Sequence, residues 1–319
     1  MNDALLNDEV IIYLLSEIII YLLLFIAFLA TPTIIKNWNF NNFSSKQFKL
    51  ENRSYLVITI ISFTIILKIM LIPYLIYTID ELSNIVAGAM CGAGVIKANA
   101  YGNPLLFLKI IVIFLSGFWI TINQIDLKSK NYKYTILKLW LFVAIFFLMT
   151  MEITLDILYF TNIETSKPVS CCSVIFDNRD YLFMGLDVTK IVILFYLLYM
   201  LTILTTLSKK YAISMLANIL FLPIAYYSVV YFFGTYIYQL PTHKCPFCMM
   251  QSDYYFVGYL LWGLLILGVF RGINQSIIEI FFAPHQNKKD YIALVLLTLF
   301  VLLCSGFVLF YYIERGVFL

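Results

Sequence analysis

The sequence predicts an all-α fold, a polytopic transmembrane helix bundle with about eight spans. Hydrophobic residues make up 62% of the 319 residues and charged residues only 12%, whereas a soluble globular domain carries roughly 25% charged residues. Apolar runs recur along the chain, each long enough to cross roughly 30 Å of hydrocarbon at about 1.5 Å per residue. Because backbone polar groups must be satisfied within lipid and no alternating strands recur, we expect these runs to be helices.

The predicted spans follow one another in a single integral membrane domain covering residues 1–319. Their approximate bounds are 11–30, 55–77, 105–122, 134–160, 181–207, 213–238, 254–270 and 291–312. The first run begins with acidic residues where a cleavable signal peptide is basic, so we expect it to be a span. After the seventh run, apolar residues resume at Ile277–Phe282. That helix either extends past the membrane surface or is followed by an amphipathic segment lying on it.

Lysine and arginine are unequally divided between the two sets of loops, which predicts the orientation of the chain. The loops after spans one, three, five and seven hold twelve: Lys36, Lys46, Lys49, Arg53, Lys128, Lys130, Lys133, Lys209, Lys210, Arg271, Lys288 and Lys289. The opposite side holds five: Lys97, Lys167, Arg179, Lys244 and Arg315. Because cytoplasmic loops are enriched in Lys and Arg, we expect both termini to be extracytoplasmic, in the lipid bilayer of a bacterial inner membrane.

Five of the six cysteines fall in loops that this orientation places outside the cytoplasm. Cys91 lies between spans two and three. Cys171 and Cys172 lie between spans four and five, and Cys245 and Cys248 between spans six and seven. The bacterial periplasm is oxidising, so such thiols can form disulfides or bind metals there.

The sharpest local motif is HKCPFCMM at residues 243–250. Its Cys-Pro-x-Cys unit holds two sulfurs close enough to bridge, and a neighbouring cation on Lys244 or His243 would stabilise a thiolate. The same segment offers soft metal ligands: the sulfurs of Cys245 and Cys248, the imidazole, and the thioethers of Met249 and its neighbour. Sulfur donors favour Cu(I), and four sulfur or nitrogen donors favour zinc.

Three interpretations of the cysteines follow and remain open. In thiol–disulfide exchange, Cys245 attacks a partner disulfide, Cys248 resolves the mixed disulfide, and a membrane quinone accepts the electrons. In metal handling, Cys245, Cys248 and His243, with Met249 or Met250, hold copper for a periplasmic protein partner. In the third, the cysteines form structural disulfides in a non-catalytic membrane subunit or transporter.

Membrane helices, a CxxC unit at the extracytoplasmic surface and further loop cysteines together are similar in outline to the quinone-linked disulfide oxidoreductases of the DsbB and vitamin K epoxide reductase type. The resemblance implies that Cys245 and Cys248 are the quinone-proximal pair and that Cys171 and Cys172, or Cys91, are shuttle thiols. Those proteins are compact bundles of four or five helices, whereas about eight spans are predicted here. Only the CxxC unit itself corresponds.

Ionisable residues inside predicted spans are costly and are therefore candidate functional residues. Lys68 lies near the middle of span two, and Glu152 and Asp156 share one helix face toward the outer end of span four, where we expect water to reach them. Asp187 and Lys190 lie in the first turns of span five and are placed to pair. We favour an interhelical salt bridge of Lys68 with a carboxylate over a proton or ion path through these groups.

Other polar side chains are expected to mark the membrane boundaries. Lys109 and Lys138 lie near span ends, where long side chains reach toward the interface. Several tyrosines near the outer ends of spans six and seven are expected to form an interfacial belt: Tyr226, Tyr227, Tyr236, Tyr238, Tyr254 and Tyr255.

Several classes of function are excluded by what the sequence lacks. The chain has two histidines, His243 and His285, and no CxxCH motif, so no haem is expected. No basic patch large enough for nucleic acid occurs, and no Walker or Gly-rich nucleotide motif is present.

Overall fold

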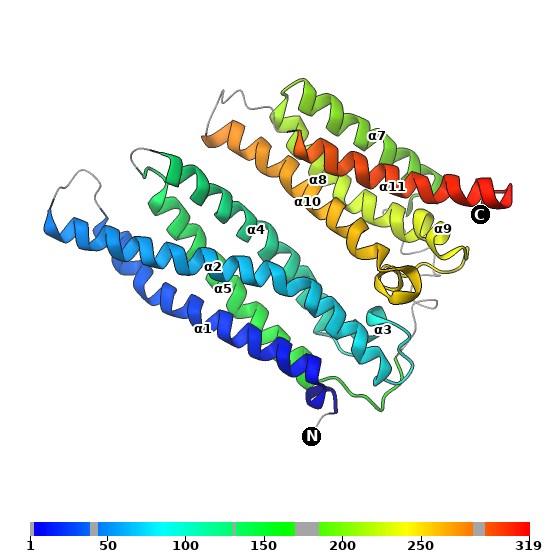
Figure 1. The fold of residues 1–319 in the computed structure, drawn as a ribbon, viewed down its shortest axis with the longest axis horizontal. Coiled ribbons are helices and arrows are strands. Elements are labelled where there is room, and N and C mark those ends of the chain that lie inside the picture. Colours follow the sequence, from blue (N-terminus) through cyan, green and yellow to red (C-terminus); the bar gives the residue numbers. More distant parts are fainter. Residues whose placement is uncertain (1–2, 39–43, 130–131, 170–184, 283–290) are drawn as a thin grey trace. The chain divides into compact units, whose positions relative to one another are not determined.

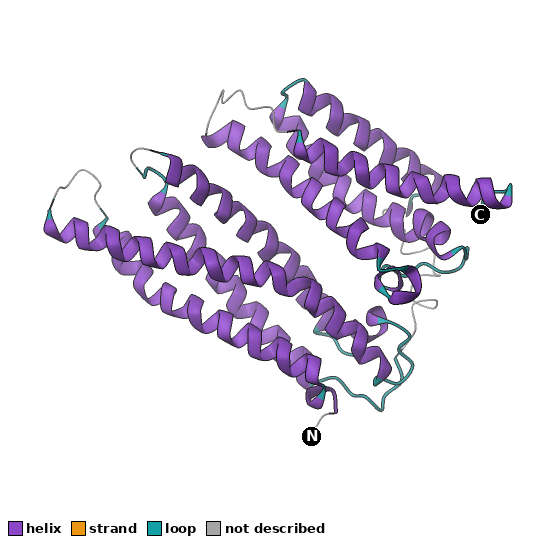
Figure 2. Ribbon diagram, viewed as in Figure 1, coloured by secondary structure: helices purple, strands orange, loops and turns teal. Residues whose placement is uncertain are grey.

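The structure is a computed structural model that describes residues 3–38, 44–129, 132–169, 185–282 and 291–319. All regular secondary structure in these ranges is helical, with no strand among them (Figure 2). Eight helices are long and apolar enough to cross a membrane. The prediction of an all-α fold with about eight helices able to span a membrane is therefore confirmed for the described residues.

The helices of the N-terminal half are α1 (Asp8–Asn37), α2 (Ser45–Glu81), α3 (Gly92–Ile96), α4 (Gly102–Lys128) and α5 (Thr135–Thr161), with the short turns η1 (Asp3–Leu6) and η2 (Leu82–Asn84). Those of the C-terminal half are α7 (Val188–Leu207), α8 (Tyr211–Ser228), η5 (Val229–Phe233), α9 (Gly234–Tyr238), η6 (Cys248–Met250), η7 (Ser252–Tyr254), α10 (Val257–Ile277), η8 (Ile278–Phe282) and α11 (Ile292–Arg315). The π-helical η5 joins α8 to α9, and the π-helical η8 continues α10.

The chain divides into two compact units, each built on four long helices (Figure 1). The first comprises Met1–Ala87 and Val95–Val169, and the second comprises Gly88–Gly94 and Ser170–Leu319. In the first unit, α1 packs against α2 and α5, and α4 packs against α5. In the second unit, α8 packs against α7 and α10, and α10 packs against α11. That the whole chain is a single domain stays a prediction.

Most helices extend beyond the predicted apolar runs, and polar N-cap residues set the beginnings of α1 and α2. Asn7 caps α1, accepting hydrogen bonds from the backbone N–H groups of Glu9 and Val10 at 3.0 and 3.3 Å. Ser44 caps α2 in the same way, so α2 begins at Ser45, ten residues before the predicted apolar run. The seventh span continues through η8 to Phe282, so the helix extends as the first of its two alternatives predicted.

The fifth span is shorter than predicted. It begins at Val188 rather than at residue 181, and Asp187 is its N-cap, accepting a hydrogen bond from Val188 N at 2.9 Å. Within the described part of this region, Asp187 therefore serves the helix end and forms no ion pair with Lys190. The sequence placed both in the first helical turns, because the apolar run extends upstream of the cap.

Lys138 does not reach toward the interface as predicted, but lies buried between α4 and α5. Its Nζ is 2.7 Å from Asp126 Oδ2 and 3.0 Å from Asn123 Oδ1. Asp126 also accepts hydrogen bonds from Tyr134 N and Thr135 Oγ1, at 2.8 and 2.9 Å. Asp126 thus fixes the α4–α5 connection, and the ammonium of Lys138 balances its buried charge.

We expect Gly268→Ala to destabilise the second unit. A Cβ at Gly268 in α10 would lie 2.7 Å from Cδ2 and 2.9 Å from Cγ of Leu297 in α11, whose side chain is 1% exposed. Overpacking of this kind costs about 1–3 kcal/mol. Gly263→Ala is the matched control, because a Cβ there meets no described atom within 4 Å. Thermal unfolding in detergent should show a lower midpoint for G268A only, and equal midpoints would contradict the packing described.

Candidate functional site

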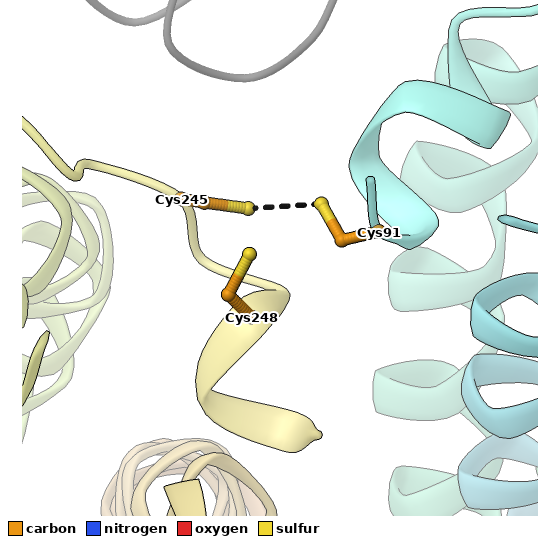
Figure 3. Close-up of side chains that lie close together, drawn as sticks. All are labelled: Cys91, Cys245 and Cys248. Carbon is orange, nitrogen blue, oxygen red and sulfur yellow. Dashed lines mark hydrogen bonds between the residues drawn. The ribbon is translucent and has the colours of Figure 1, made fainter. Parts of the chain in front are cut away.

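Three cysteines far apart in the sequence come together in the second unit (Figure 3). Cys91 immediately precedes α3, Cys245 lies in the loop after α9, and Cys248 begins η6. Cys91 Sγ lies 3.3 Å from Cys245 Sγ, and all three sulfurs lie within 4.8 Å of one another. The side chains are 0%, 1% and 6% exposed, respectively. We call this group the three-sulfur cluster.

The loop that carries Cys245 and Cys248 is held by aromatic residues from the flanking helices. The hydroxyl of Tyr238, at the end of α9, donates to the carbonyl oxygen of Cys245 and accepts from Met249 N at 3.0 Å. Trp262 in α10 donates from Nε1 to the carbonyl oxygen of Pro246 at 3.3 Å. These bonds pin the turn at both ends, so its two sulfurs keep one orientation.

A glycine on α10 lets this turn approach the helix closely. A Cβ at Gly258 would lie 2.6 Å from Cγ of Met249 and 2.7 Å from Cγ of Met250. Met249 is fully buried there, and its Cε lies 3.8 Å from the Cβ position of Gly234 in α9. The thioether predicted as a copper ligand is therefore used to pack the turn between α9 and α10.

His243 lies beside the cluster with its ring against Tyr238, the two centroids 4.2 Å apart. Burial lowers the pKa of His243, an effect that the negative charge of an ionised Cys91 would oppose. Its Nε2 has no hydrogen-bond partner among the described residues. His243 does not join the three sulfurs in the group of closely spaced ligand atoms. We therefore expect a neutral imidazole at pH 7 rather than the thiolate-stabilising cation suggested by the sequence.

The surroundings of Cys248 disfavour ionisation of its thiol. Hydrogen bonding with Cys245 and with Cys91 raises the pKa of the Cys248 thiol, and burial raises it further. Lys244 is the second residue that the sequence offered as a cation near the thiols. Its Nζ lies 5.8 Å from the centroid of the Tyr231 ring. Cys248 is thus expected to stay protonated at neutral pH when it is reduced.

The remaining cysteines are separate from this geometry. Cys171 and Cys172 lie outside the described residues. Cys304 is buried within α11, as its place in the last predicted span implied. The structure thus brings together Cys91 and the CxxC pair, three of the five loop cysteines that the sequence singled out.

Two tyrosines assigned to an interfacial belt are instead internal. Tyr236 and Tyr238 are 3% and 5% exposed, and Tyr238 anchors the Cys245 turn. The sequence pattern of repeated tyrosines at span ends does not separate the two roles. The sequence analysis did not identify Trp262 and Gly258 as residues that hold the Cys245 turn. Both lie on α10, and no local sequence motif marks a helix residue that contacts a distant loop.

The ionisable residues of the first unit form a buried network that joins four helices. Lys68 Nζ in α2 pairs with Glu17 in α1 and lies 2.9 Å from Glu152 Oε1 in α5. Lys109 Nζ in α4 lies 2.5 Å from the same Glu152 oxygen and 2.9 Å from Asp156 Oδ2. The predicted interhelical salt bridge of Lys68 with a carboxylate is confirmed.

Two expectations for these groups are wrong. Glu152 and Asp156 are 1% and 0% exposed, so they are not in contact with water at a span end. Lys109 is 5% exposed and points into the bundle rather than toward the interface. It also donates to the hydroxyl of Tyr13 at 2.7 Å. The cause is the same in each case: each charge has a partner of opposite sign on another helix, which offsets its desolvation.

We expect Tyr238→Phe to loosen the Cys245 turn without unfolding the bundle. The substitution leaves the buried Met249 N–H and Cys245 carbonyl without their shared partner, at a cost of about 1–2 kcal/mol, or a factor of about 5–30 in local opening. The rate at which a maleimide modifies reduced Cys245 and Cys248 should rise by that factor. Tyr255→Phe is the control, because Tyr255 is 92% exposed. Equal labelling rates in both variants would show that the hydroxyl does not hold the turn.

No protein-family model, no curated protein and no solved structure matches the chain. The likeness to quinone-linked disulfide oxidoreductases therefore still rests on the CxxC unit of Cys245 and Cys248. The geometry of the three-sulfur cluster and of the buried charges is the basis on which function is proposed below.

Proposed function

We propose that the chain is a bacterial inner-membrane protein that carries out thiol–disulfide exchange at its extracytoplasmic side, through Cys91, Cys245 and Cys248. The observation that supports this most directly is the 3.3 Å contact between the sulfurs of Cys91 and Cys245. Cys245 is also the CxxC neighbour of Cys248, whose sulfur lies in the same group. Cys245 is thus placed to bond with either of two sulfurs with little backbone movement.

The exchange step conserves electrons. The Cys91 thiolate attacks Cys245 in a Cys245–Cys248 disulfide; the Cys91–Cys245 bond forms as the Cys245–Cys248 bond breaks. Cys248 leaves as a thiolate and takes up a proton, in keeping with the raised pKa of its thiol. The reverse step restores the CxxC disulfide. The exchange moves a disulfide from one pair to another without net oxidation.

Net electron transfer needs an external couple at each end of this exchange. On one side we propose a disulfide or dithiol of a periplasmic protein partner. On the other side, a membrane quinone accepts two electrons and two protons from a dithiol, yielding a disulfide and a hydroquinone. Because Cys245 is only 1% exposed, we infer that a partner exchanges first with another loop cysteine, for which Cys171 and Cys172 are the candidates in the sequence.

The orientation belongs to the same proposal. Lysine and arginine gather in the loops after spans one, three, five and seven, which favours a cytoplasmic position for those loops. Both termini and the loops of Cys91 and Cys245 would then face the periplasm, an oxidising compartment. There the cluster can meet protein thiols that the cytoplasm would keep reduced.

Differential alkylation and mass spectrometry of the native protein test the exchange. We expect Cys248→Ser to accumulate a Cys91–Cys245 disulfide and Cys91→Ser to accumulate a Cys245–Cys248 disulfide, because either partner can reach Cys245. Both bonds should be reduced by mild dithiothreitol. Cys304→Ser is the control and should leave the pairing unchanged, since Cys304 is buried inside α11.

The opposing result is a single pairing that persists in every variant able to form it and that resists mild reductant. It would instead support structural disulfides in a non-catalytic membrane subunit or transporter. A change of pairing in the Cys304→Ser variant would show that the substitutions disturb the fold rather than report on exchange.

Soft-metal handling is the second candidate, favoured by the grouping of three sulfurs within 4.8 Å. Three thiolates at such spacing suit Cu(I), which prefers sulfur donors. If copper is the ligand, anaerobically purified protein should bind about one Cu(I) per chain, and Cys91→Ser should weaken binding by about tenfold or more. His243→Ala should retain copper, since His243 does not join the group. Equal Cu(I) affinity in wild type and Cys91→Ser would exclude the cluster as the site.

A further inference from the structure

A pocket of about 430 Å³ lies in the first unit, between the first turns of α2 and the connection from α4 to α5. The long helices pack as pairs, α2 on α1 and α4 on α5, while α2 and α4 touch each other little. Room is left between the two pairs as a result. The volume falls within the range of about 300–1,000 Å³ that is usual for small-molecule sites.

One face of α2 lines this pocket. Its residues there follow one another at helical spacing and include Glu51, Tyr55, Thr59 and Ser62. Tyr55 is 72% exposed, and Leu127 on the α4 side of the pocket is 53% exposed. Because α2 and α4 are both long and apolar enough to span a membrane, we expect these exposed side chains to face lipid or its polar boundary. A molecule dissolved in the bilayer can then enter the pocket from the side.

The pocket holds little unpaired charge. The ammonium of Lys138 at its inner end is paired with Asp126 at 2.7 Å. Glu51 lines the outer end, where it accepts a hydrogen bond from Gln47 Nε2 at 3.0 Å and has no ion pair among the described residues. The described basic residues of the neighbouring segments do not line the pocket: Lys36, Lys46, Lys49, Arg53, Lys128 and Lys133. A phosphate group would meet a carboxylate and no unpaired cation, so the lining favours an uncharged ligand.

The lining offers hydrogen-bonding capacity of both kinds. The Lys138 ammonium has only donors, so Asn123 must turn Oδ1 toward it, at 3.0 Å, and Nδ2 toward Ser62 Oγ, at 3.3 Å. One N–H of that amide has no partner in the described part of the unit. Thr59 donates its hydroxyl proton to a carbonyl oxygen one turn earlier at 2.9 Å, and its oxygen accepts no described bond. Asn123 is 7% exposed and Thr59 is exposed, so a ligand in the pocket can reach both.

We propose that this pocket binds an uncharged lipid with a free hydroxyl group, the chemistry of a diacylglycerol. The ligand hydroxyl accepts a hydrogen bond from Asn123 Nδ2 and donates one to Thr59 Oγ1, while the apolar part of the ligand lies against Ile58 and Leu127. A hydroxyl both donates and accepts, which matches the two spare groups. A quinone carbonyl only accepts, and it would leave Thr59 unused. The site is separate from the cysteines and does not depend on the reaction proposed for them.

Photolabelling of the full-length protein in phosphatidylcholine nanodiscs tests the assignment. The probe is a diacylglycerol with a diazirine in one acyl chain, and mass spectrometry locates the labelled peptides. We expect label within residues 51–62 and 123–138, and we expect unlabelled diacylglycerol to compete with it. Phosphatidylglycerol with the same acyl chains should not compete, because its phosphate is charged. Ubiquinone should compete at least threefold more weakly than diacylglycerol.

Two variants with matched controls test the hydrogen bonds. Thr59→Val removes the acceptor and should raise the concentration of diacylglycerol needed for half-maximal competition by about three- to tenfold, the usual effect of one lost hydrogen bond. Thr154→Val is its control, because Thr154 is an exposed threonine of α5 that makes the same bond to its own helix, at 2.8 Å, away from the pocket. Asn123→Ala should have an effect like that of Thr59→Val. Its control is Gln124→Ala, since Gln124 is exposed and does not line the pocket.

The proposal is overturned if the probe does not label these segments, or if phosphatidylglycerol or ubiquinone competes as well as diacylglycerol does. It is also overturned if competition in Thr59→Val equals that in Thr154→Val. Because Asn123 also bonds to Lys138, size-exclusion chromatography must establish that Asn123→Ala is folded. If it is not, Thr59→Val alone decides the question, since that change is made at an exposed position of the helix surface.

Discussion

The first unit depends on the pairing of two lysines with three acids at the centre of its four helices. In lipid, the hydrophobic effect does not drive one helix against another, whereas an unpaired charge is costly wherever it meets hydrocarbon. Lys68 and Lys109 each contact carboxylates on other helices. The register of α1, α2, α4 and α5 is thereby restricted to the arrangement in which all five groups meet, and the apolar core around Ile61, Trp119 and Phe142 packs within that register.

The second unit uses close packing rather than charge to position its cysteines. Gly258 and Gly234 let the buried Met249 lie between α9 and α10, and Tyr238 and Trp262 fix the backbone of the loop. A turn held at so many points loses little entropy when its sulfurs are brought together. This preorganisation explains how a loop, normally the least ordered part of a membrane protein, can keep Cys245 and Cys248 in a defined contact with Cys91.

The sequence sufficed for the fold class and for the eight spans, because hydropathy reports directly on burial in lipid. It also singled out Cys91, Cys245 and Cys248, since their loops fall on one side of the predicted topology.

The sequence failed to predict a residue's role where that role depends on another helix. Lys109 and Lys138 resemble snorkelling lysines until their acidic partners are placed beside them. Tyr238 resembles a belt residue until its hydroxyl is seen to hold the Cys245 turn. Pairing across helices leaves no periodic signal in a single sequence.

The number of thiols also bears on what the cluster does. A disulfide uses two sulfurs, so three sulfurs in mutual contact always leave one thiol beside any bridge they form. The loop cysteines number five, and pairing within the chain leaves at least one of these unbridged as well. A purely structural framework has no use for such a thiol, which can attack the adjacent disulfide. In the three-sulfur cluster the sulfurs of Cys91 and Cys245 are buried and lie 3.3 Å apart, so in the exchange that we propose the third thiol lies next to the disulfide that it attacks.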